Sequence, residues 1–239
     1  MRRLLIALAA TVAAAGAHAA TPSLSIDVTP VTTYVWRGIP LTDGPALQLG
    51  YTLEAAGVSF NVWENVDLDN ANGRTGEVTE HDYTLGATFK AGKHDVSLAL
   101  LYYTFPGSGD PTTELVAGVT FDAPWKPSVT LYQDLDDYKG LYVSAGATAG
   151  VELGARMLDL SFAVGYGTAA HNAYYGVDKA CLTDVLLTAS STFEFGEAFS
   201  ITPALSFASV LDGEIVDAFK AKNLDAGRAV FGVTLAYIF

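Results

Sequence analysis

The chain contains 239 residues, half of them hydrophobic, with 26 acidic and 13 basic side chains and a formal net charge of −13. Nucleic-acid binding is disfavoured, because phosphate recognition requires clustered lysine and arginine residues. The single cysteine, Cys181, cannot form an internal disulfide, which excludes a small secreted domain held together by disulfide bonds.

The N-terminal segment has the features of a secretion signal. Arg2 and Arg3 precede an apolar run, and a small-x-small cleavage site, Ala17-His18-Ala19, follows it. The run is shorter than the ~20 apolar residues that a membrane-spanning helix needs. We therefore predict a cleaved signal peptide at residues 1–19 and a single exported domain at residues 20–239.

The last nine residues show the clearest strand pattern. Phe231, Val233, Leu235, Tyr237 and Phe239 alternate with four other residues, and this two-residue period indicates a strand with one apolar face. The same alternation recurs along the whole chain. It predicts about twelve strands, at residues 24–36, 47–53, 58–62, 83–89, 96–102, 115–121, 129–131, 141–153, 158–166, 185–193, 199–207 and 231–239.

The side chains between these apolar positions are mostly small and uncharged, as in Thr188, Ser190 and Thr192. A water-soluble β-sandwich would carry Lys, Glu and Arg on its solvent face. No part of the predicted mature chain approaches the ~18 continuous apolar residues of a transmembrane helix, so a membrane-spanning form must be a closed barrel. The sequence therefore predicts an all-β protein, a closed antiparallel transmembrane β-barrel with lipid outside and polar groups inside.

The connections between the predicted strands alternate in length. The short ones cover residues 54–57, 90–93, 122–127, 152–157 and 196–198, and the long ones cover residues 38–45, 67–79, 105–112, 134–140, 169–184 and 210–228. Short periplasmic turns and longer outer loops are typical of bacterial outer-membrane barrels, and an even number of strands returns both termini to the periplasm. We expect this location and orientation.

Aromatic residues gather at the predicted strand ends, where amphipathic rings meet lipid headgroups. The predicted outer girdle contains Tyr34, Trp36, Tyr83, Tyr102, Tyr166 and Phe207, and the periplasmic girdle contains Phe89, Phe121, Phe193, Phe199, Tyr237 and Phe239. The terminal Phe239, with Tyr237 two positions earlier, resembles the closing strand that the barrel assembly machinery recognises. Pro30 and Pro203 fall inside predicted strands, and each is expected to mark a bulge.

Residues 33–50, Thr-Tyr-Val-Trp-Arg-Gly-Ile-Pro-Leu-Thr-Asp-Gly-Pro-Ala-Leu-Gln-Leu-Gly, resemble the opening motif of the TorF family of porin-like proteins. In that motif an aromatic-Arg-Gly turn leads through a Thr-Asp pair into a Pro-Ala-x-Gln strand. Residues 61–67, Asn-Val-Trp-Glu-Asn-Val-Asp, are similar to a second stretch of the family, except that Glu64 stands where a small residue is expected. The resemblance covers roughly the first fifth of the predicted mature chain. It implies an outer-membrane channel-like protein and no particular substrate.

Within this motif, we expect Trp36 to anchor the outer membrane interface and Arg37 to face the lumen or its rim. The Asp43-Gly44-Pro45 sequence is a strong turn signal. The motif could set the register of the first hairpin or bind a ligand.

The histidines outside the predicted signal are His81, His94 and His171. A barrel lipid hydrolase needs a Ser–His pair with an orienting polar group, and His171 has no serine near it in the sequence. Residues 67–73 superficially resemble a calcium-binding loop. However, Ala71 stands where that loop has an oxygen ligand, and Gly73 comes one residue later than the glycine of the loop. The sequence predicts no catalytic residue, no metal site and no cofactor.

About eight strands leave room only for packed side chains and sixteen make a wide pore, so about twelve strands predict a narrow lumen. The candidate pore-lining residues are Gln48, Asn61, Trp63, Thr84, Tyr103, Thr130, Tyr132, Tyr142, Ser144, Thr188 and Ser190. Aspartates in the predicted outer loops would form an acidic mouth that concentrates cations, or would only keep the rim soluble or bridge divalent ions to lipopolysaccharide. They are Asp67, Asp69, Asp134, Asp136 and Asp137.

The leading hypothesis is a passive channel for water, ions and small polar solutes, weakly cation-preferring and surrounded by outer-membrane lipid and lipopolysaccharide. One alternative is a non-conducting structural or adhesion barrel whose outer loops bind a partner. A lumen plug would favour it, and the bulky inward residues able to form one are Trp63, Leu101, Tyr103, Tyr132 and Tyr142. A lipid-hydrolysing barrel is the third hypothesis.

Overall fold

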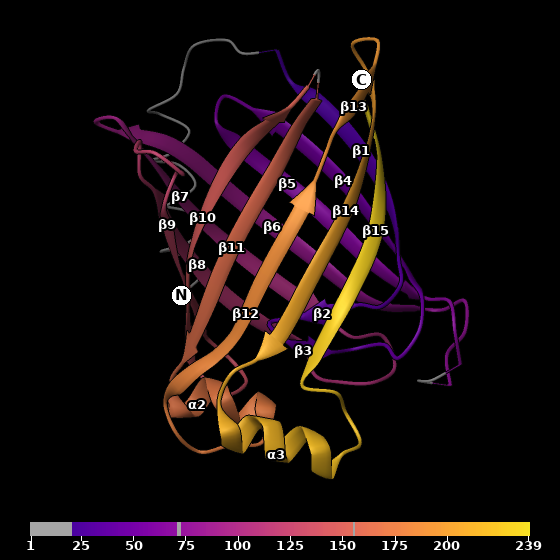
Figure 1. The fold of residues 1–239 in the computed structure, drawn as a ribbon, viewed down its shortest axis with the longest axis vertical. Helices are drawn as coiled ribbons and strands as arrows, with labels where there is room; N and C mark the ends of the chain where they lie inside the picture. The colour runs from indigo at the N-terminus through magenta and orange to yellow at the C-terminus, as the bar shows by residue number, and fades with distance from the viewer. Residues whose placement is uncertain (1–20, 71–72, 155) are drawn as a thin grey trace.

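The computed structural model describes residues 21–70, 73–154 and 156–239. The predicted signal peptide, residues 1–19, lies outside the described residues. The described chain forms a closed antiparallel β-barrel (Figure 1). Neighbouring wall strands are hydrogen-bonded to each other, and the first wall strand pairs with the last. The predicted all-β barrel is confirmed.

Twelve strands form the wall. They are β1 (Ser23–Val31), β4 (Ala46–Ala55), β5 (Val58–Asp67), β6 (Val78–Ala91), β7 (His94–Thr104), β8 (Thr112–Thr120), β9 (Ser128–Asp134), β10 (Leu141–Leu153), β11 (Arg156–Gly167), β12 (Cys181–Ser190), β14 (Phe199–Val210) and β15 (Gly227–Ile238). The short β13 (Phe193–Phe195) continues β12 along β14 in the same register. In the described residues, no helix is long and apolar enough to cross a membrane.

Apolar side chains point outward from this wall. Leu205 on β14, Leu53 on β4 and Phe162 on β11 are 58%, 50% and 46% exposed, although each lies within a paired strand. Because residues i and i+2 of a strand share a face, the two-residue period places all such residues on one side. An apolar belt of this extent is stable against lipid rather than water.

Adjacent leucines on β7 test this assignment. Leu100 pairs with Leu85 and Leu115 on the outward face, whereas Leu101 pairs with Thr84 and Glu114 on the inward face. We expect Leu100→Arg to impair assembly, because a charge near the bilayer midplane costs ~2 to 4 kcal/mol, and Leu101→Arg to be tolerated. The measurement is the fraction of protein whose migration on an SDS gel changes on boiling. The reverse order would mean that the two faces are exchanged.

The two ends of the barrel differ. Short turns join the strands at one end, which we call the turn end, and longer connections lie at the opposite loop end (Figure 1). The loop end carries α2 (Ala169–Asn172), the 3-10 helix η1 (Ala173–Tyr175) and α3 (Gly213–Ala221). The chain finishes at the turn end, where the Phe239 amide donates to the Leu24 carbonyl. The predicted alternation of short and long connections is therefore confirmed.

The first wall strand is shorter than the predicted strand at residues 24–36. β1 ends at Val31, and the chain then leaves the wall for the lumen. Tyr34 is 9% exposed and Trp36 is half-buried there, so assigning both to the outer girdle was wrong, as was the membrane-anchoring role of Trp36. The other predicted members of the outer girdle are on the outward face, with exposures of 37–46%: Tyr83, Tyr102, Tyr166 and Phe207.

The two prolines do not mark bulges, so that prediction was wrong as well. β1 and β15 keep one register on both sides of Pro30, and only the pairs at Thr29 and Pro30 are missing. Pro203 lies opposite the interruption between β12 and β13. A proline removes one N–H from the ladder, and here the wall loses that local pairing without inserting an extra residue.

Candidate functional site: a constriction in the barrel lumen

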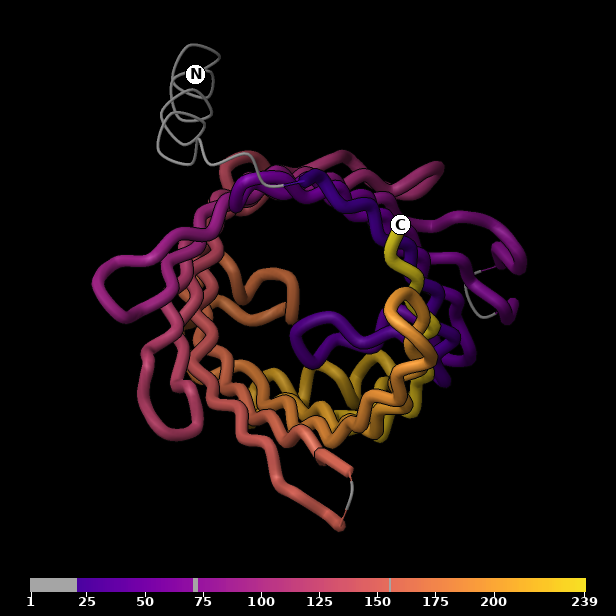
Figure 2. The backbone as a smooth tube through the Cα atoms, turned by 90° about the horizontal axis from the view of Figure 1, so that it is seen from above, coloured from indigo at the N-terminus to yellow at the C-terminus, as the bar shows by residue number. Residues whose placement is uncertain are grey.

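The connection between β1 and β4 folds into the barrel. We call residues 32–45 the inserted hairpin. Its strands, β2 (Val35–Trp36) and β3 (Ile39–Pro40), pair only with each other. Seen along the barrel, this indigo segment enters the ring from one side and the orange segment of the connection at residues 168–180 enters from another (Figure 2). The two segments narrow the lumen at the loop end.

A two-residue turn, Arg37-Gly38, forms the tip of the inserted hairpin. The φ angles are +47° at Arg37 and +80° at Gly38, the left-handed pair of a type I′ hairpin turn. A Cβ atom on Gly38 would lie 2.9 Å from Cβ of Asp184 and 3.1 Å from Cγ1 of Val210. Glycine is therefore required by space as well as by conformation, and the tip lies against β12 and β14.

Polar contacts hold the base of the inserted hairpin. The Thr33 hydroxyl donates to the Thr42 carbonyl (2.6 Å), and the Tyr34 amide donates to the Thr42 hydroxyl (2.8 Å). Arg228 on β15 forms an ion pair with Asp43 (3.2 Å). These contacts give a structural role to the Thr-Asp pair of the sequence motif.

The Arg37 side chain crosses the lumen to Glu114 on β8, five strands away from β1 around the wall. Its two terminal nitrogens each lie 2.8 Å from a Glu114 oxygen, a bidentate ion pair in which the side chains are 8% and 4% exposed. The guanidinium also lies 4.3–4.5 Å from the ring centroids of Tyr142, Tyr132 and Trp36. Burial alone would lower the pKa of Arg37, but the hydrogen bonds and charge of Glu114 outweigh it and raise that pKa.

A second carboxylate lies beneath the tip. Asp184 on β12 accepts hydrogen bonds from the Thr183 hydroxyl (2.7 Å) and from the Tyr142 hydroxyl (3.1 Å). The Tyr103 hydroxyl makes the corresponding contact with Glu114 (2.8 Å). Tyrosines of the wall therefore orient both acidic groups.

His171 on α2 lies beside the constriction and is 1% exposed. Its ring centroid is 5.0 Å from that of Tyr142 and 6.1 Å from that of Trp36. Burial, reinforced by the charge of Arg37, lowers the pKa of His171 to about 3, so the imidazole is neutral at physiological pH. Within the described part of the chain, no serine hydroxyl hydrogen-bonds to His171, to His81, which pairs with Glu64, or to His94.

A cavity of about 510 Å³ adjoins the inserted hairpin inside the lumen. Its charged lining residues are Arg37, Asp82 and Asp184. The charge of Arg37 is paired with that of Glu114, and Asp82 and Asp184 are the acidic side chains of the lining. A larger hollow, of about 1030 Å³, lies against outward-facing residues such as Leu160, Phe162 and Leu205 and belongs to the lipid-facing surface.

Six of the eleven predicted pore-lining residues border the lumen cavity: Gln48, Trp63, Tyr103, Tyr132, Tyr142 and Ser144. The others lie at inward-facing positions elsewhere on the wall: Asn61, Thr84, Thr130, Thr188 and Ser190. Sequence reasoning did not select Asp82, Glu114 or Asp184 as pore-lining residues. The period of β6 and β8 places Asp82 and Glu114 on the polar face, and that signal could have identified them.

The predicted acidic mouth is only partly exposed. Asp134 is 2% exposed and accepts hydrogen bonds from the Thr112 hydroxyl (2.8 Å) and from the backbone amides of Asp136, Asp137 and Tyr138 (2.9–3.2 Å). Asp134 therefore stabilises the loop that follows it. Asp136 and Asp137 are exposed.

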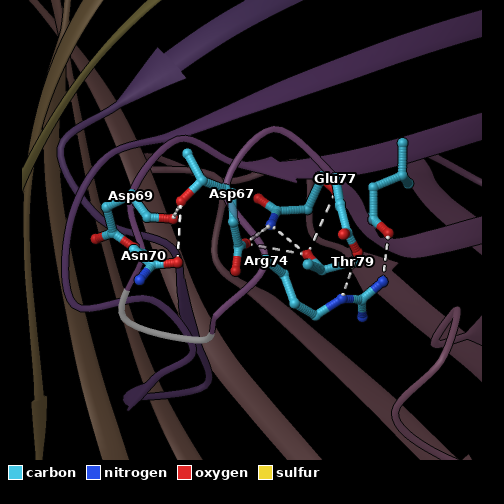
Figure 3. A network of polar contacts seen from close by, with 9 residues as sticks. Asp67, Asp69, Asn70, Arg74, Glu77 and Thr79 are labelled. Carbon is cyan, nitrogen blue, oxygen red and sulfur yellow. Dashed lines mark hydrogen bonds and ion pairs between the residues drawn. The ribbon is translucent and has the colours of Figure 1, made fainter.

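The loop after β5 uses its polar groups in the same way (Figure 3). Asp67, 1% exposed, accepts hydrogen bonds from Asn65 (2.9 Å) and Thr79 (3.1 Å). Arg74 pairs with Glu77 (2.9 Å), while Asp69 is half-buried. Nowhere in the described ranges do three or more His, Cys, Asp or Glu side chains form a group that could hold a metal ion.

No protein-family model and no curated protein matches the chain. Among solved structures, it is similar to the KdgM porin, with a TM-score of 0.53 and 10% identity over 89% of this chain and 98% of that chain. The chain has a porin-type barrel fold. The KdgM porin in complex with disordered oligogalacturonate gives a TM-score of 0.52 with the same identity and coverage. An anion-selective porin from Comamonas acidovorans gives a TM-score of 0.36 with 11% identity, over 91% of this chain and 98% of that chain.

Proposed function

We propose that the protein is a narrow passive channel of the bacterial outer membrane for water, ions and small polar solutes. The observation that carries this proposal is the lumen itself, where a cavity of about 510 Å³ is bordered by polar and aromatic side chains. The buried apolar cluster of the described residues lies in the loop-end connections, around Tyr175 and Phe219. A lumen lined in this way can hold water, which the passage of polar solutes requires.

In this proposal residues 1–19 direct export and are cleaved, both termini are periplasmic, and the loop end faces the exterior. Lipid and lipopolysaccharide cover the outward face, and Tyr237 and Phe239 are recognised during assembly. The motif at residues 33–50 favours membership of the TorF family, and that motif forms the inserted hairpin and the start of β4.

We assign the weak cation preference mainly to the constriction. The charge of Arg37 is paired with Glu114, so Asp184 sets the sign of the field in the cavity. In a narrow passage with low-dielectric walls such charges attract cations and repel anions. Small neutral and cationic solutes therefore fit this lumen better than an acidic oligosaccharide such as the oligogalacturonate bound to the similar porin.

Planar-bilayer recording of the purified protein tests the proposal. We expect discrete single-channel steps and, across a KCl gradient, a reversal potential with the sign of cation preference. Single-channel steps with a reversal potential of the opposite sign would contradict the proposed cation preference but not the proposed channel function. Absence of steps from protein that still shows heat-dependent gel migration would contradict the channel.

A second candidate is the non-conducting structural or adhesion barrel. The observation favouring it is the contact of the inserted hairpin with bulky wall residues, since the Tyr34 and Trp63 rings lie 5.4 Å apart and Tyr132 contacts Arg37. In that case the loop end would bind a partner and the lumen would stay closed. We rank a lipid-hydrolysing barrel third and propose no enzymatic activity.

A further inference from the structure

The connection at residues 168–180 contacts the tip of the inserted hairpin through one tyrosine. Tyr175, the last residue of η1, is fully buried, and its hydroxyl donates a 2.7 Å hydrogen bond to the backbone carbonyl of Arg37. The same hydroxyl lies 3.5 Å from Oδ1 of Asp184. The acceptor belongs to the residue whose side chain forms the ion pair with Glu114.

The tip needs such a contact. Arg37 has a positive φ, which is unfavourable for a residue with a Cβ and persists only where surrounding structure holds it. β2 and β3 each contain two residues and pair only with each other, so they provide little support of their own. The Tyr175 hydroxyl connects the turn to a part of the molecule outside the inserted hairpin.

α3 in turn fixes Tyr175. The Tyr175 ring stacks on Phe219 with a centroid separation of 6.4 Å, and both belong to a buried cluster with Val210 and Ile215. Lys179 also joins the connection at residues 168–180 to the start of α3. Its Nζ lies 3.0 Å from Oδ1 of Asp212 and 2.8 Å from Oε1 of Glu214. Asp212 is the N-cap of α3 and accepts from the Glu214 amide (2.9 Å).

We propose that Tyr175 is a positioning residue for the constriction: it holds the backbone of Arg37, and thereby the Arg37–Glu114 ion pair, across the lumen, while α3 holds Tyr175. The effect on conduction rests on the proposed channel function. The positioning of Arg37 by Tyr175 does not depend on that function.

The neighbouring tyrosine provides a matched control for the test. The Tyr174 hydroxyl donates to Asp134 (3.1 Å) and Asp137 (3.2 Å) and not to the Arg37 carbonyl, and its ring contacts Trp36 with centroids 5.6 Å apart, a contact that phenylalanine keeps. In planar bilayers Tyr175→Phe should increase the conductance and reduce the cation preference towards the non-selective value, whereas Tyr174→Phe should change neither. In an Arg37→Ala background, where the unpaired Glu114 carboxylate should strengthen the cation preference, Tyr175→Phe should cause no further change in selectivity, because it acts through Arg37.

A second measurement does not depend on conduction. With Trp63 and Trp125 replaced by Phe, Trp36 in β2 is the one tryptophan left in the chain, and acrylamide quenching of its fluorescence reports access to the inserted hairpin. We expect stronger quenching in Tyr175→Phe and in Phe219→Ala than in Tyr174→Phe, with all three proteins still heat-modifiable on gels.

Equal quenching in all three variants and in their parent would overturn the positioning role, as would a rise in Tyr174→Phe as large as that in Tyr175→Phe. Absence of conduction by the unmodified protein would overturn the channel function, and the fluorescence comparison would still decide the positioning role.

Discussion

Shortening the inserted hairpin is expected to raise the single-channel conductance several-fold. Replacing residues 35–40 by two glycines would remove β2, the turn and β3, while the polar contacts at Thr33 and Thr42 could still close the base. A twelve-stranded wall encloses more space than side chains alone fill, so the segment that crosses the lumen limits the current. The measurement is the conductance step in symmetric KCl.

Deletion of residues 107–109, from the connection between β7 and β8, is the control for this experiment. It shortens another loop-end connection, outside the inserted hairpin and the lining of the cavity. Its conductance should equal that of the unmodified channel. If the shortened hairpin also conducts like the unmodified protein, the constriction lies elsewhere in the lumen.

Removing the partner of Arg37 should abolish the cation preference. In Glu114→Gln the guanidinium keeps its charge and loses the bidentate carboxylate, and breaking a buried pair in this way costs about 3–5 kcal/mol. The positive charge of Arg37 then offsets the negative charge of Asp184, which borders the same cavity. We expect the reversal potential in a KCl gradient to fall towards zero.

Two further variants separate this effect from a general loss of negative charge. Glu77→Gln removes the same charge from an exposed position in the loop after β5 and should leave the selectivity unaltered. The double variant Arg37→Met with Glu114→Gln removes both charges and should restore a cation preference, since Asp184 remains in the cavity. A reversal potential unaffected by Glu114→Gln alone would show that the ion pair does not border the permeation path.

The sequence alone determined the wall of this barrel. Its two-residue alternation separates a lipid-facing from a lumen-facing side in every wall strand, and each short connection interrupts that alternation, so strand number, facing and connection lengths follow from local pattern. The same parity placed Gln48, Trp63 and Tyr142 inside the lumen, where they border the cavity. These features depend on residues close together in the chain.

The tertiary structure decided the position of the inserted hairpin. The alternation in Thr-Tyr-Val-Trp is as typical of a wall strand as of a hairpin in the lumen. The two-residue period alone therefore predicted a first strand that reaches Trp36. The chain turns inward because Arg37 forms an ion pair with Glu114, 77 residues away, and because its backbone carbonyl accepts a hydrogen bond from Tyr175, 138 residues away. Such pairings are contacts between distant segments, and a local pattern carries no information about which of the available acidic and tyrosine side chains the closed barrel brings to the arginine.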